Sequence, residues 1–392
     1  MDWKARADRL AAEVTHPASR WRPLVAAMPR HVFVPRWWAW SQRGPLLWHD
    51  TWELRDGPAD PPAWLDAAYS DKSLVTRVGP RHADHAGAAD RPTGRPTSST
   101  TMPGLVVHMY RHAMIGDGMR VLDVGTGSGY GCALLTRRLG ERRVTSIDID
   151  DYLTAIAAER LDSLGLRPRI LSGDATGPLP GTYDRIVAMV AVRPVPASWL
   201  AALRPGGRLV TTITGTALII TADKRPDGGA TGRAEWDRAG FMHARAGLDY
   251  PPGLPEQFAA IHDADGDHVG AGRYPVANIT MAWDLFSAVG VTVPGVQHHY
   301  QENEDGRRTA WLLHPDGSWA RATAMGDDPP VVHQAGPRRL WDTVDELRHA
   351  WLRDGSLPGY GSSVAVDPDG TLHLERGQWK ATIPPDVHQS AG

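Results

Sequence analysis

The chain has 392 residues, with 42 lysines and arginines against 45 aspartates and glutamates, which gives a net charge of −3. This near balance argues against the basic surface by which proteins bind nucleic acids and favours a discrete substrate groove. The length exceeds that of one ordinary domain, so we expect two domains or one domain with a long extension. The single cysteine, Cys132, excludes a disulfide framework and a CxxC metal site within one chain.

The N-terminal residues 2–14 predict an amphipathic helix rather than a signal peptide. Trp3, Leu10 and Val14 share one helical face, and charged residues occupy the others. No apolar run along the chain approaches the 18 residues that a membrane-spanning helix needs. We therefore expect a soluble, cytoplasmic protein without a membrane partner.

Tryptophan is concentrated near the N-terminus. Eight of the 16 tryptophans lie in the first 64 residues, namely Trp3, Trp21, Trp37, Trp38, Trp40, Trp48, Trp52 and Trp64. They could supply the core of a segment that is poor in regular structure. They could also wall a groove for an extended peptide, because indole rings are enriched at binding hot spots. The sequence leaves both interpretations open.

Residues 80–98 are polar and rich in glycine, proline and histidine, which predicts a mobile surface loop. The loop leads directly into the hydroxyl-rich residues 98–101, so it could act as a lid that the substrate orders. His82, Asp84 and His85 lie in this segment, but two histidines without a third anchored ligand are typical of solvated side chains. We therefore expect no metal site.

The stretch RVLDVGTGSGYGCA, residues 120–133, predicts a ligand-binding turn. An apolar run from Val121 to Val124 is typical of a buried parallel strand, and Gly125, Gly127 and Gly129 follow it before a helix. Glycines suit such a turn because the backbone takes positive φ and a ligand approaches the main chain closely. The stretch lacks the third glycine of GxGxxG and the Gly-Lys-Ser/Thr ending of a P-loop, which argues against dinucleotides and polyphosphates.

Further predicted strands place acidic residues beside this turn. Residues 144–147 end at Asp148, whose carboxylate can accept hydrogen bonds from both hydroxyls of a ribose. Asp174 follows a third strand, and residues 182–192 form a fourth. The carboxyl ends of these parallel strands would line a crevice that fits S-adenosylmethionine, a nucleoside with a cationic tail and no phosphate. The predicted fold is an α/β, Rossmann-like methyltransferase sheet with helices on both faces.

A series of ordered segments resembles the protein-L-isoaspartate O-methyltransferase family. The segments are MPRHVFVP, AYSDKSL, STTMP, VLDVGTGSGYGCALL, VTSIDID, GDA, YDRIV and LRPGGRLV. Together they cover roughly residues 20–245. The resemblance implies S-adenosylmethionine as the cofactor and a protein or peptide carboxylate as the methyl acceptor.

The resemblance also implies roles for individual residues. The cofactor would contact Asp123, Gly125, Thr126, Gly127, Ser128, Gly129, Tyr130, Asp148, Ile149, Asp174 and Ala175. Thr101, helped by Ser99 and Thr100, would orient the acceptor carboxylate. The family usually has serine at the position of Thr101 and often glutamine at that of Met102.

Three more residues are candidates for contact with the acceptor. By resemblance, Tyr69 and Asp71 would shape the site for the peptide backbone. Arg193, at the end of the fourth strand, could pair with the acceptor carboxylate or could lie at the surface. Outside the resemblance, the hydroxyls of residues 98–101 could instead cap the helix that follows them.

Methyl transfer to a carboxylate does not need a strong base. A carboxyl group with a pKa of about 3.9 is already ionised at neutral pH, so the reaction is governed by placement. We therefore expect no catalytic histidine among the 17 in the chain.

After the methyltransferase motifs, residues 216–222 and the segment around Phe241 predict two strands joined by a turn at Pro226–Gly229. Prolines at 251, 252 and 255 then mark a boundary. Beyond it the sequence predicts hairpins over 309–321 and 364–375 and an amphipathic helix over 338–355. We expect three parts: a Trp-rich substrate-binding segment (1–98), the methyltransferase core (99–246) and an α+β accessory domain (247–392).

Repair enzymes of the family generally end near residue 245 of this numbering, so the C-terminal part favours a dedicated substrate. With the Trp-rich N-terminus, it resembles actinobacterial methyltransferases encoded with ribosomally made modified peptides, such as graspetides, lanthipeptides and lasso peptides. That resemblance implies esterification of an aspartate side chain in a precursor peptide, before or after its macrocyclisation, followed by closure to an aspartimide or isoaspartate. The alternatives are isoaspartyl repair and a non-catalytic module that binds the cofactor or a peptide.

Overall fold

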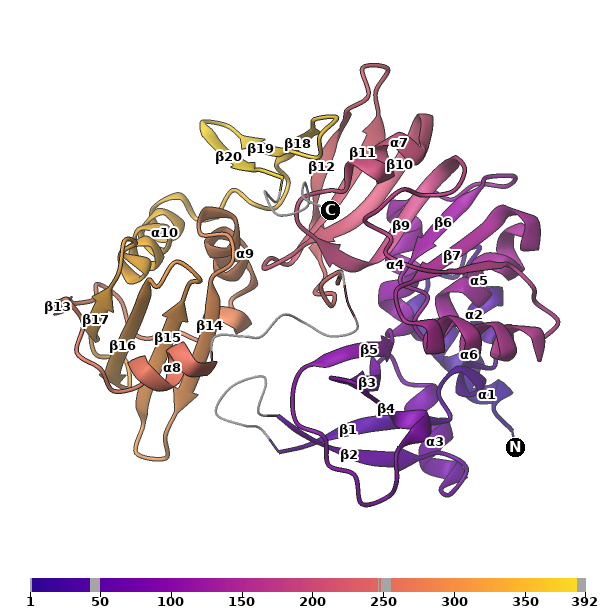
Figure 1. Cartoon of the computed structure of the whole chain (residues 1–392), viewed down its shortest axis with the longest axis horizontal. Helices are drawn as coiled ribbons and strands as arrows, with labels where there is room; N and C mark the ends of the chain where they lie inside the picture. Colours follow the sequence, from indigo (N-terminus) through magenta and orange to yellow (C-terminus); the bar gives the residue numbers. More distant parts are fainter. Residues whose placement is uncertain (1, 43–49, 246, 248–254, 386–392) are drawn as a thin grey trace.

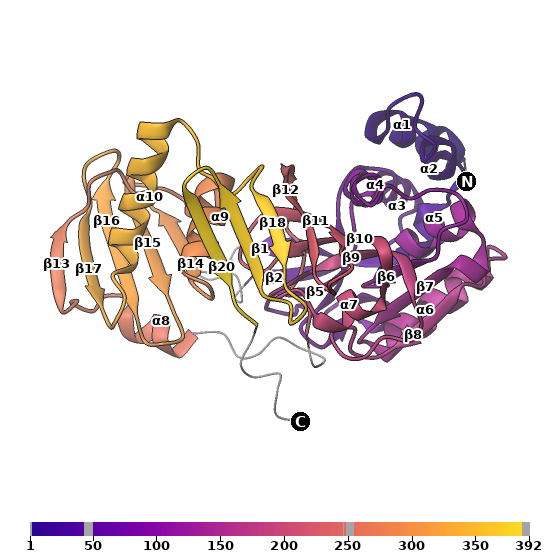
Figure 2. The ribbon, with the colours of Figure 1, turned by 90° about the horizontal axis from the view of Figure 1, so that it is seen from above.

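The computed structural model describes residues 2–42, 50–245, 247 and 255–385, which form three β-sheets with their covering helices (Figure 1). A central sheet of ten strands has the order β20-β19-β18-β12-β11-β10-β9-β6-β7-β8. A five-stranded sheet precedes it in the chain, and another five-stranded sheet is inserted before β18. Figure 2 shows the C-terminal sheet (orange) at one end of the molecule and β6, β7 and β8 at the other.

The parallel half of the central sheet confirms the predicted Rossmann-like core. Its strands are β6 (Val121–Val124), β7 (Val144–Asp148), β8 (Arg169–Ser172), β9 (Tyr183–Val192) and β10 (Leu203–Ile213). Val121 and Val187 pack on one face with α4 (Pro103–His112), α5 (Tyr130–Leu139) and α6 (Asp151–Asp162). Leu122 and Ile186 pack on the other face with α7 (Ala197–Ala202). Successive residues of a strand point to opposite faces, so one apolar run fills both cores.

The N-terminal tryptophans mainly form core. This part contains α1 (Lys4–Val14), α2 (Arg22–Ala27), α3 (Pro61–Ala68), β1 (Arg36–Gln42), β2 (Thr51–Asp56), β3 (Leu74–Val78), β4 (Arg81–His82) and β5 (Pro96–Thr100). Trp21, Trp37, Trp38 and Trp52 are buried, while Trp40 is exposed. Trp48 lies outside the described residues. The core interpretation therefore accounts for most of this cluster.

The prediction of a mobile loop over residues 80–98 is wrong. The segment contains β4, a short 3-10 helix and the start of β5, and Ala83 is fully buried. Asp84 accepts a 2.7 Å hydrogen bond from Arg160 of α6, and His82 Nε2 lies 3.1 Å from the Asp150 carboxylate. Polar composition misled the prediction, because these charged groups are paired with α6 rather than solvated.

The C-terminal region contains the predicted hairpin and helix. Its elements are α8 (Pro255–Ile261), β13 (His268–Ala271), α9 (Trp283–Thr292), β14 (Gln297–Glu302), β15 (Arg307–Leu313), β16 (Trp319–Met325), β17 (Val331–Ala335) and α10 (Leu340–Asp354). Gly355, with φ of 71°, ends α10 as predicted. None of the helices in the described part of the chain is long and apolar enough to span a bilayer.

The predicted boundary of the accessory domain needs correction. The second hairpin, β18 (Ser363–Val366) and β19 (Leu372–Arg376), continues into β20 (Trp379–Ile383), and all three strands extend the central sheet. They attach to β12 (Ala230–Arg238), which itself follows β11 (Leu218–Lys224). β12 would otherwise be an open edge, and an open edge readily pairs with another strand. The chain thus leaves the central sheet for the third sheet and then returns.

Candidate active site

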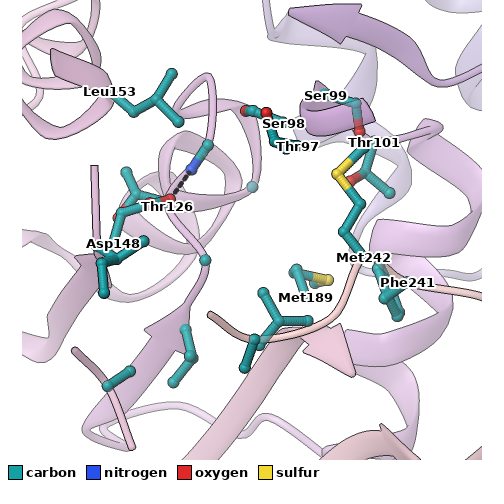
Figure 3. Close-up of a pocket in the computed structure, with 18 of the residues that line it drawn as sticks. Thr97, Ser98, Ser99, Thr101, Thr126, Asp148, Leu153, Met189, Phe241 and Met242 are labelled. Carbon is teal, nitrogen blue, oxygen red and sulfur yellow. Dashed lines mark hydrogen bonds between the residues drawn. The ribbon is translucent and has the colours of Figure 1, made fainter. Parts of the chain in front are cut away.

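A cavity of about 260 Å³ opens at the carboxyl ends of the parallel strands. It contains the glycine-rich turn after β6, Asp148 and Ile149 after β7, and Asp174 after β8. Figure 3 shows Ser99, Thr101 and Met242 on one side of this cavity and Thr126 and Asp148 on the opposite side. The predicted cofactor residues other than Gly129 and two of the predicted acceptor residues therefore meet in one place.

The glycine-rich turn leaves no room for side chains. Gly125 and Gly127 have φ of 92° and 51°, a region that favours glycine. A β-carbon on Gly127 would lie 3.3 Å from the Ser99 carbonyl oxygen, and one on Gly125 would lie 3.1 Å from Val190. The turn thus brings bare backbone against both the cavity and strand β5.

Gly129 has a different role from the predicted one. It does not line the cavity, and a β-carbon there would lie 3.1 Å from the side chain of Ala157 on α6. Its φ of 96° begins helix α5. Gly129 therefore lets α5 and α6 pack closely, while Thr126, Ser128 and Tyr130 line the cavity with the other two glycines.

Two carboxylates in the cavity wall are held by backbone donors. Asp148 accepts a 2.8 Å hydrogen bond from Gly127 N at one oxygen and a 3.2 Å bond from Asp150 N at the other. Burial raises the pKa of Asp148, although these backbone bonds lower it. Asp174 accepts bonds from the amide and hydroxyl of Thr176, and the neighbouring Ala175 carbonyl accepts a bond from the indole of Trp199. Both acids are therefore fixed in orientation before a ligand arrives.

Asp123 offers a buried acceptor to the cavity. The Ser146 hydroxyl donates to its Oδ2 at 2.8 Å, whereas its Oδ1 has no hydrogen-bond partner among the described residues. Burial raises the pKa of Asp123 to about 7, despite the Ser146 hydrogen bond. A buried carboxylate oxygen without a partner is costly, and a cationic ligand group would satisfy it. The cavity thus fits a ligand that carries positive charge.

Hydroxyl groups line the acceptor side of the cavity. Ser98, Ser99 and Thr101 border it, and the Ser98 hydroxyl accepts a 3.0 Å bond from Thr76. Thr100 points elsewhere: it is 1% exposed, and its carbonyl accepts a bond from Arg30. The predicted role of Thr100 at the acceptor therefore needs correction, because its side chain is buried and does not line the cavity.

The alternative that these hydroxyls cap the following helix is wrong. α4 begins at Pro103, its capping residue is Met102, and no side chain accepts from its first turn in the manner of an N-cap serine or threonine. Instead, Asp71 Oδ1 accepts a 2.7 Å bond from Gly104 N. The hydroxyls of Ser99 and Thr101 remain available to the cavity.

Tyr69 and Asp71 do not reach the cavity. Tyr69 is 7% exposed and its hydroxyl lies 2.7 Å from His31 Nδ1, inside the N-terminal core. Asp71 holds the start of α4, as described above. Neither residue lines the cofactor cavity, and the expectation that they shape the site for the peptide backbone stays a prediction. Arg193 also lies off the cavity wall, although its charge contributes to lowering the pKa of His243.

The segment 240–245 closes the cavity, and sequence reasoning missed it. The prediction placed a strand around Phe241, but β12 ends at Arg238, and Phe241 and Met242 line the cavity instead. Met242 O accepts a 2.8 Å bond from Ala191 N, which ties the segment to β9.

The end of the same segment carries two basic residues. Arg245 donates a hydrogen bond to the Thr97 carbonyl at 3.1 Å. Burial, followed by the charges of Arg95 and Arg193, lowers the pKa of His243 to about 4. No motif marks this segment.

The sequence was compared with known families and proteins. The family model described as protein-L-isoaspartate(D-aspartate) O-methyltransferase matches residues 88–237. Protein-L-isoaspartate O-methyltransferase 1 of Anaeromyxobacter sp. (strain Fw109-5) is 36% identical over 159 residues, which are 38% of this chain and 74% of the relative. The chain belongs to the protein-L-isoaspartate O-methyltransferase family. The family's name describes methyl transfer to an oxygen of isoaspartyl or D-aspartyl residues in proteins.

Coverage differs among the relatives. The protein-L-isoaspartate O-methyltransferase of Thermotoga maritima is 32% identical over 124 residues, which are 31% of this chain and only 39% of that protein. A solved structure named protein-L-isoaspartate O-methyltransferase aligns over 95% of this chain and 99% of its own, with a TM-score of 0.50 and 17% identity. This likeness in fold extends past residue 245. At 17% identity, this likeness concerns the fold alone.

Proposed function

We propose that the protein methylates the side-chain carboxylate of an aspartate in a ribosomally made modified peptide. The observation that carries the proposal is that Ser99 and Thr101, at and just after the end of β5, border the same cavity as the glycine-rich turn. The turn and β5 approach each other closely, since a β-carbon added to Gly127 would lie 3.3 Å from the Ser99 carbonyl oxygen. A carboxylate held by the Ser99 and Thr101 hydroxyls would face the methyl donor.

The residues around the cavity suit transfer to a carboxylate. S-adenosylmethionine supplies a methyl group that is already activated on a sulfonium. Asp148 would hold the ribose, Asp174 would face the adenine amino group, and Asp123 would meet the positive charge. Ser99 and Thr101 would donate hydrogen bonds to the acceptor, whose oxygen forms a bond to the methyl carbon as the carbon–sulfur bond breaks. Such an acceptor is ionised at neutral pH, so placement alone is needed.

A second cleft supports a peptide as the acceptor. It begins at Met102, next to Thr101, shares Leu105 with the cofactor cavity and extends to Trp236 and Arg376. Trp236 is 65% exposed, and the Arg376 guanidinium lies 4.9 Å from its ring centre. Exposed aromatic and arginine side chains are typical anchors for a peptide. An extended chain whose aspartate sits at Thr101 could lie along this cleft.

Aspartate, rather than isoaspartate, is favoured by the chain's own sequence. Thr101 and Met102 replace the serine and glutamine usual in the repair enzymes, and residues 338–370 resemble those of the peptide-modifying methyltransferases. Esterification would convert the side chain into one with a methoxide leaving group. The following backbone nitrogen could then attack the ester carbonyl, release methanol and close an aspartimide.

Isoaspartyl repair is the second candidate. It is favoured by the names of the relatives from Anaeromyxobacter and Thermotoga, and it would use the same residues around the cavity. The two candidates differ only in which carboxylate reaches the hydroxyls. They therefore predict opposite preferences between two acceptors of one sequence.

Matched peptides separate the candidates. Peptides identical except for aspartate or isoaspartate at one position, each linear and macrocyclised, are offered to the full chain with S-adenosylmethionine. We expect a higher kcat/KM for an aspartate peptide, followed by loss of methanol in the mass spectrum. Methylation confined to the isoaspartyl peptides would overturn the proposal in favour of repair.

A further inference from the structure

Two histidines and an aspartate form a cluster outside the cofactor cavity. His108 and His112 lie one turn apart on α4, and Asp237 lies on β12. Nε2 of His108 is 2.8 Å and Nε2 of His112 is 3.1 Å from the same carboxylate oxygen, Oδ2 of Asp237. The three potential ligand atoms all lie within 4.8 Å of one another. Histidines at i and i+4 share one helical face, which is why both reach β12.

A fourth residue, Glu235, lies close to one of the histidines without a hydrogen bond to it. Nδ1 of His112 lies 3.7 Å from Oε1 of Glu235, whose side chain is 4% exposed. Thr221 and Arg233 hold the Glu235 carboxylate through hydrogen bonds of 2.6 and 2.8 Å. A carboxylate at the far nitrogen of a histidine is the usual outer partner of a metal-binding imidazole, because it leaves Nε2 as the ligand atom.

We propose that His108, His112 and Asp237 bind a divalent transition-metal ion of the zinc type. Two imidazoles and one carboxylate favour such an ion over magnesium or calcium, which prefer oxygen ligands. Three protein ligands leave a position for water or a ligand, and His108 and Asp237 both border the second cleft. The site contains none of the residues assigned to the cofactor or the acceptor, and it does not depend on which carboxylate is methylated.

The ion would join two parts of the protein. α4 follows Thr101 by one residue, and Leu105 and Val106 of this helix line the cofactor cavity. β12 carries the returning strands β18 to β20. Without an ion, the same geometry would be an ordinary cluster in which two imidazoles donate to Asp237. Metal titration distinguishes the two.

The test uses the full chain after treatment with EDTA. Cobalt(II) is titrated while visible absorption is recorded, and zinc bound after equilibrium dialysis is measured by atomic emission. We expect one equivalent of zinc per chain and cobalt bands that zinc displaces. Absence of saturable binding of either ion would overturn the proposal.

Variants locate the ion. Asp237→Asn changes a residue with a side chain that is 50% exposed, so the chain should fold, and it should lose the cobalt bands. Glu235→Gln should weaken zinc binding by about 10- to 100-fold, as expected for an outer partner. His373→Ala is the control. His373 lies on β19, and its Nε2 is 2.9 Å from the Asp367 carboxylate, so its loss should not affect metal binding at His108 and His112. Equal binding in wild type and Asp237→Asn, with both folded by circular dichroism, would place the ion elsewhere.

Discussion

The parallel half of the central sheet and the C-terminal region differ in how they use their polar residues. Around the cavity, some polar groups can still form hydrogen bonds with a ligand. Asp123 Oδ1 lacks a partner among the described residues, and Ser99 and Thr101 line the cavity. In the C-terminal region, Trp341, Val344 and Leu340 pack α10 onto its sheet in a regular apolar core. Buried polar atoms without a partner among the described residues occur in both regions, for instance Trp341 Nε1 and Asp345 Oδ1 in the C-terminal one. Asp123 differs in that it lines a cavity together with a glycine-rich turn, which is the combination expected where a ligand binds.

The glycine-rich turn is tested by Gly127→Ala. A β-carbon there combines a φ of 51° with a contact of 3.3 Å to the Ser99 carbonyl. The left-handed conformation alone costs about 1–2 kcal/mol, so cofactor affinity should fall by about 5- to 30-fold in calorimetry. Gly165→Ala is the matched control, because Gly165 has a φ of 68° with open space around it, away from the cavity. Equal affinity in the two variants would contradict the assigned role of the turn.

The next effect concerns the two neighbouring threonines. Thr101→Val removes a hydroxyl that faces the cavity and keeps the shape of the side chain. A hydrogen bond to a charged acceptor contributes about 1.5–3 kcal/mol, so kcat/KM for the peptide should fall about 10- to 150-fold with little change in cofactor affinity. Thr100→Val should leave turnover unchanged, because Thr100 faces the core and its hydroxyl has no partner among the described residues. Similar losses in both variants would contradict the different surroundings of the two threonines.

A pH-dependent effect is expected at Asp123. Burial raises its pKa from the usual 3.8 to about 7, so between these values the folded chain holds a proton that the unfolded chain has lost. Stability without ligand should therefore fall as the pH rises from about 4 to 7, and the loss is complete above 7. Asp123→Asn should remove this pH-dependent part of the free energy of unfolding. The free energy of unfolding should then rise by up to about 4 kcal/mol at pH 8, with little change near pH 4. Denaturant unfolding of the variant and the wild type at pH 4 and pH 8 measures this change. An equal change in the free energy of unfolding at both pH values would contradict the prediction.

The smallest effect is expected in the second cleft. Trp236→Ala removes an exposed ring that Arg376 covers. A contact between the peptide and this exposed ring should contribute about 0.5–1 kcal/mol. Without the ring, the KM for the peptide should rise about 2- to 5-fold while the KM for the cofactor stays constant. Trp40→Ala, at another exposed tryptophan that does not border the cleft, is the control. An unchanged peptide KM in Trp236→Ala would argue against the cleft as the peptide path.

The sequence predicted the cofactor half of the site better than the rest. Each strand end there carries its own local signal, such as the glycines after Val124 or the acid at Asp148, and parallel strands bring these ends together. Long-range pairing carries no local signal. For that reason the attachment of β18 to β12 and the position of Phe241 and Met242 were missed.

The paired charges of the N-terminal part show a related limit. Asp84 and His82 looked like solvated loop residues, yet Arg160 and Asp150 of a distant segment pair with them. Composition describes a segment by itself, whereas its partners come from elsewhere in the fold. Long-range partners also fix the surroundings of Asp71, whose carboxylate accepts a hydrogen bond from Gly104 at the start of α4, and of Tyr69, whose hydroxyl lies 2.7 Å from His31 Nδ1.

The most direct test of the central claim is to locate the transferred methyl group. The full chain is incubated with S-adenosylmethionine that carries an isotopically labelled methyl group and with the aspartate peptide, and the product is fragmented in a mass spectrometer. We predict the label on the aspartate side-chain carboxylate in the wild type and its near absence with Thr101→Val. Label on any other atom, or no label in a chain that binds the cofactor, would contradict the account.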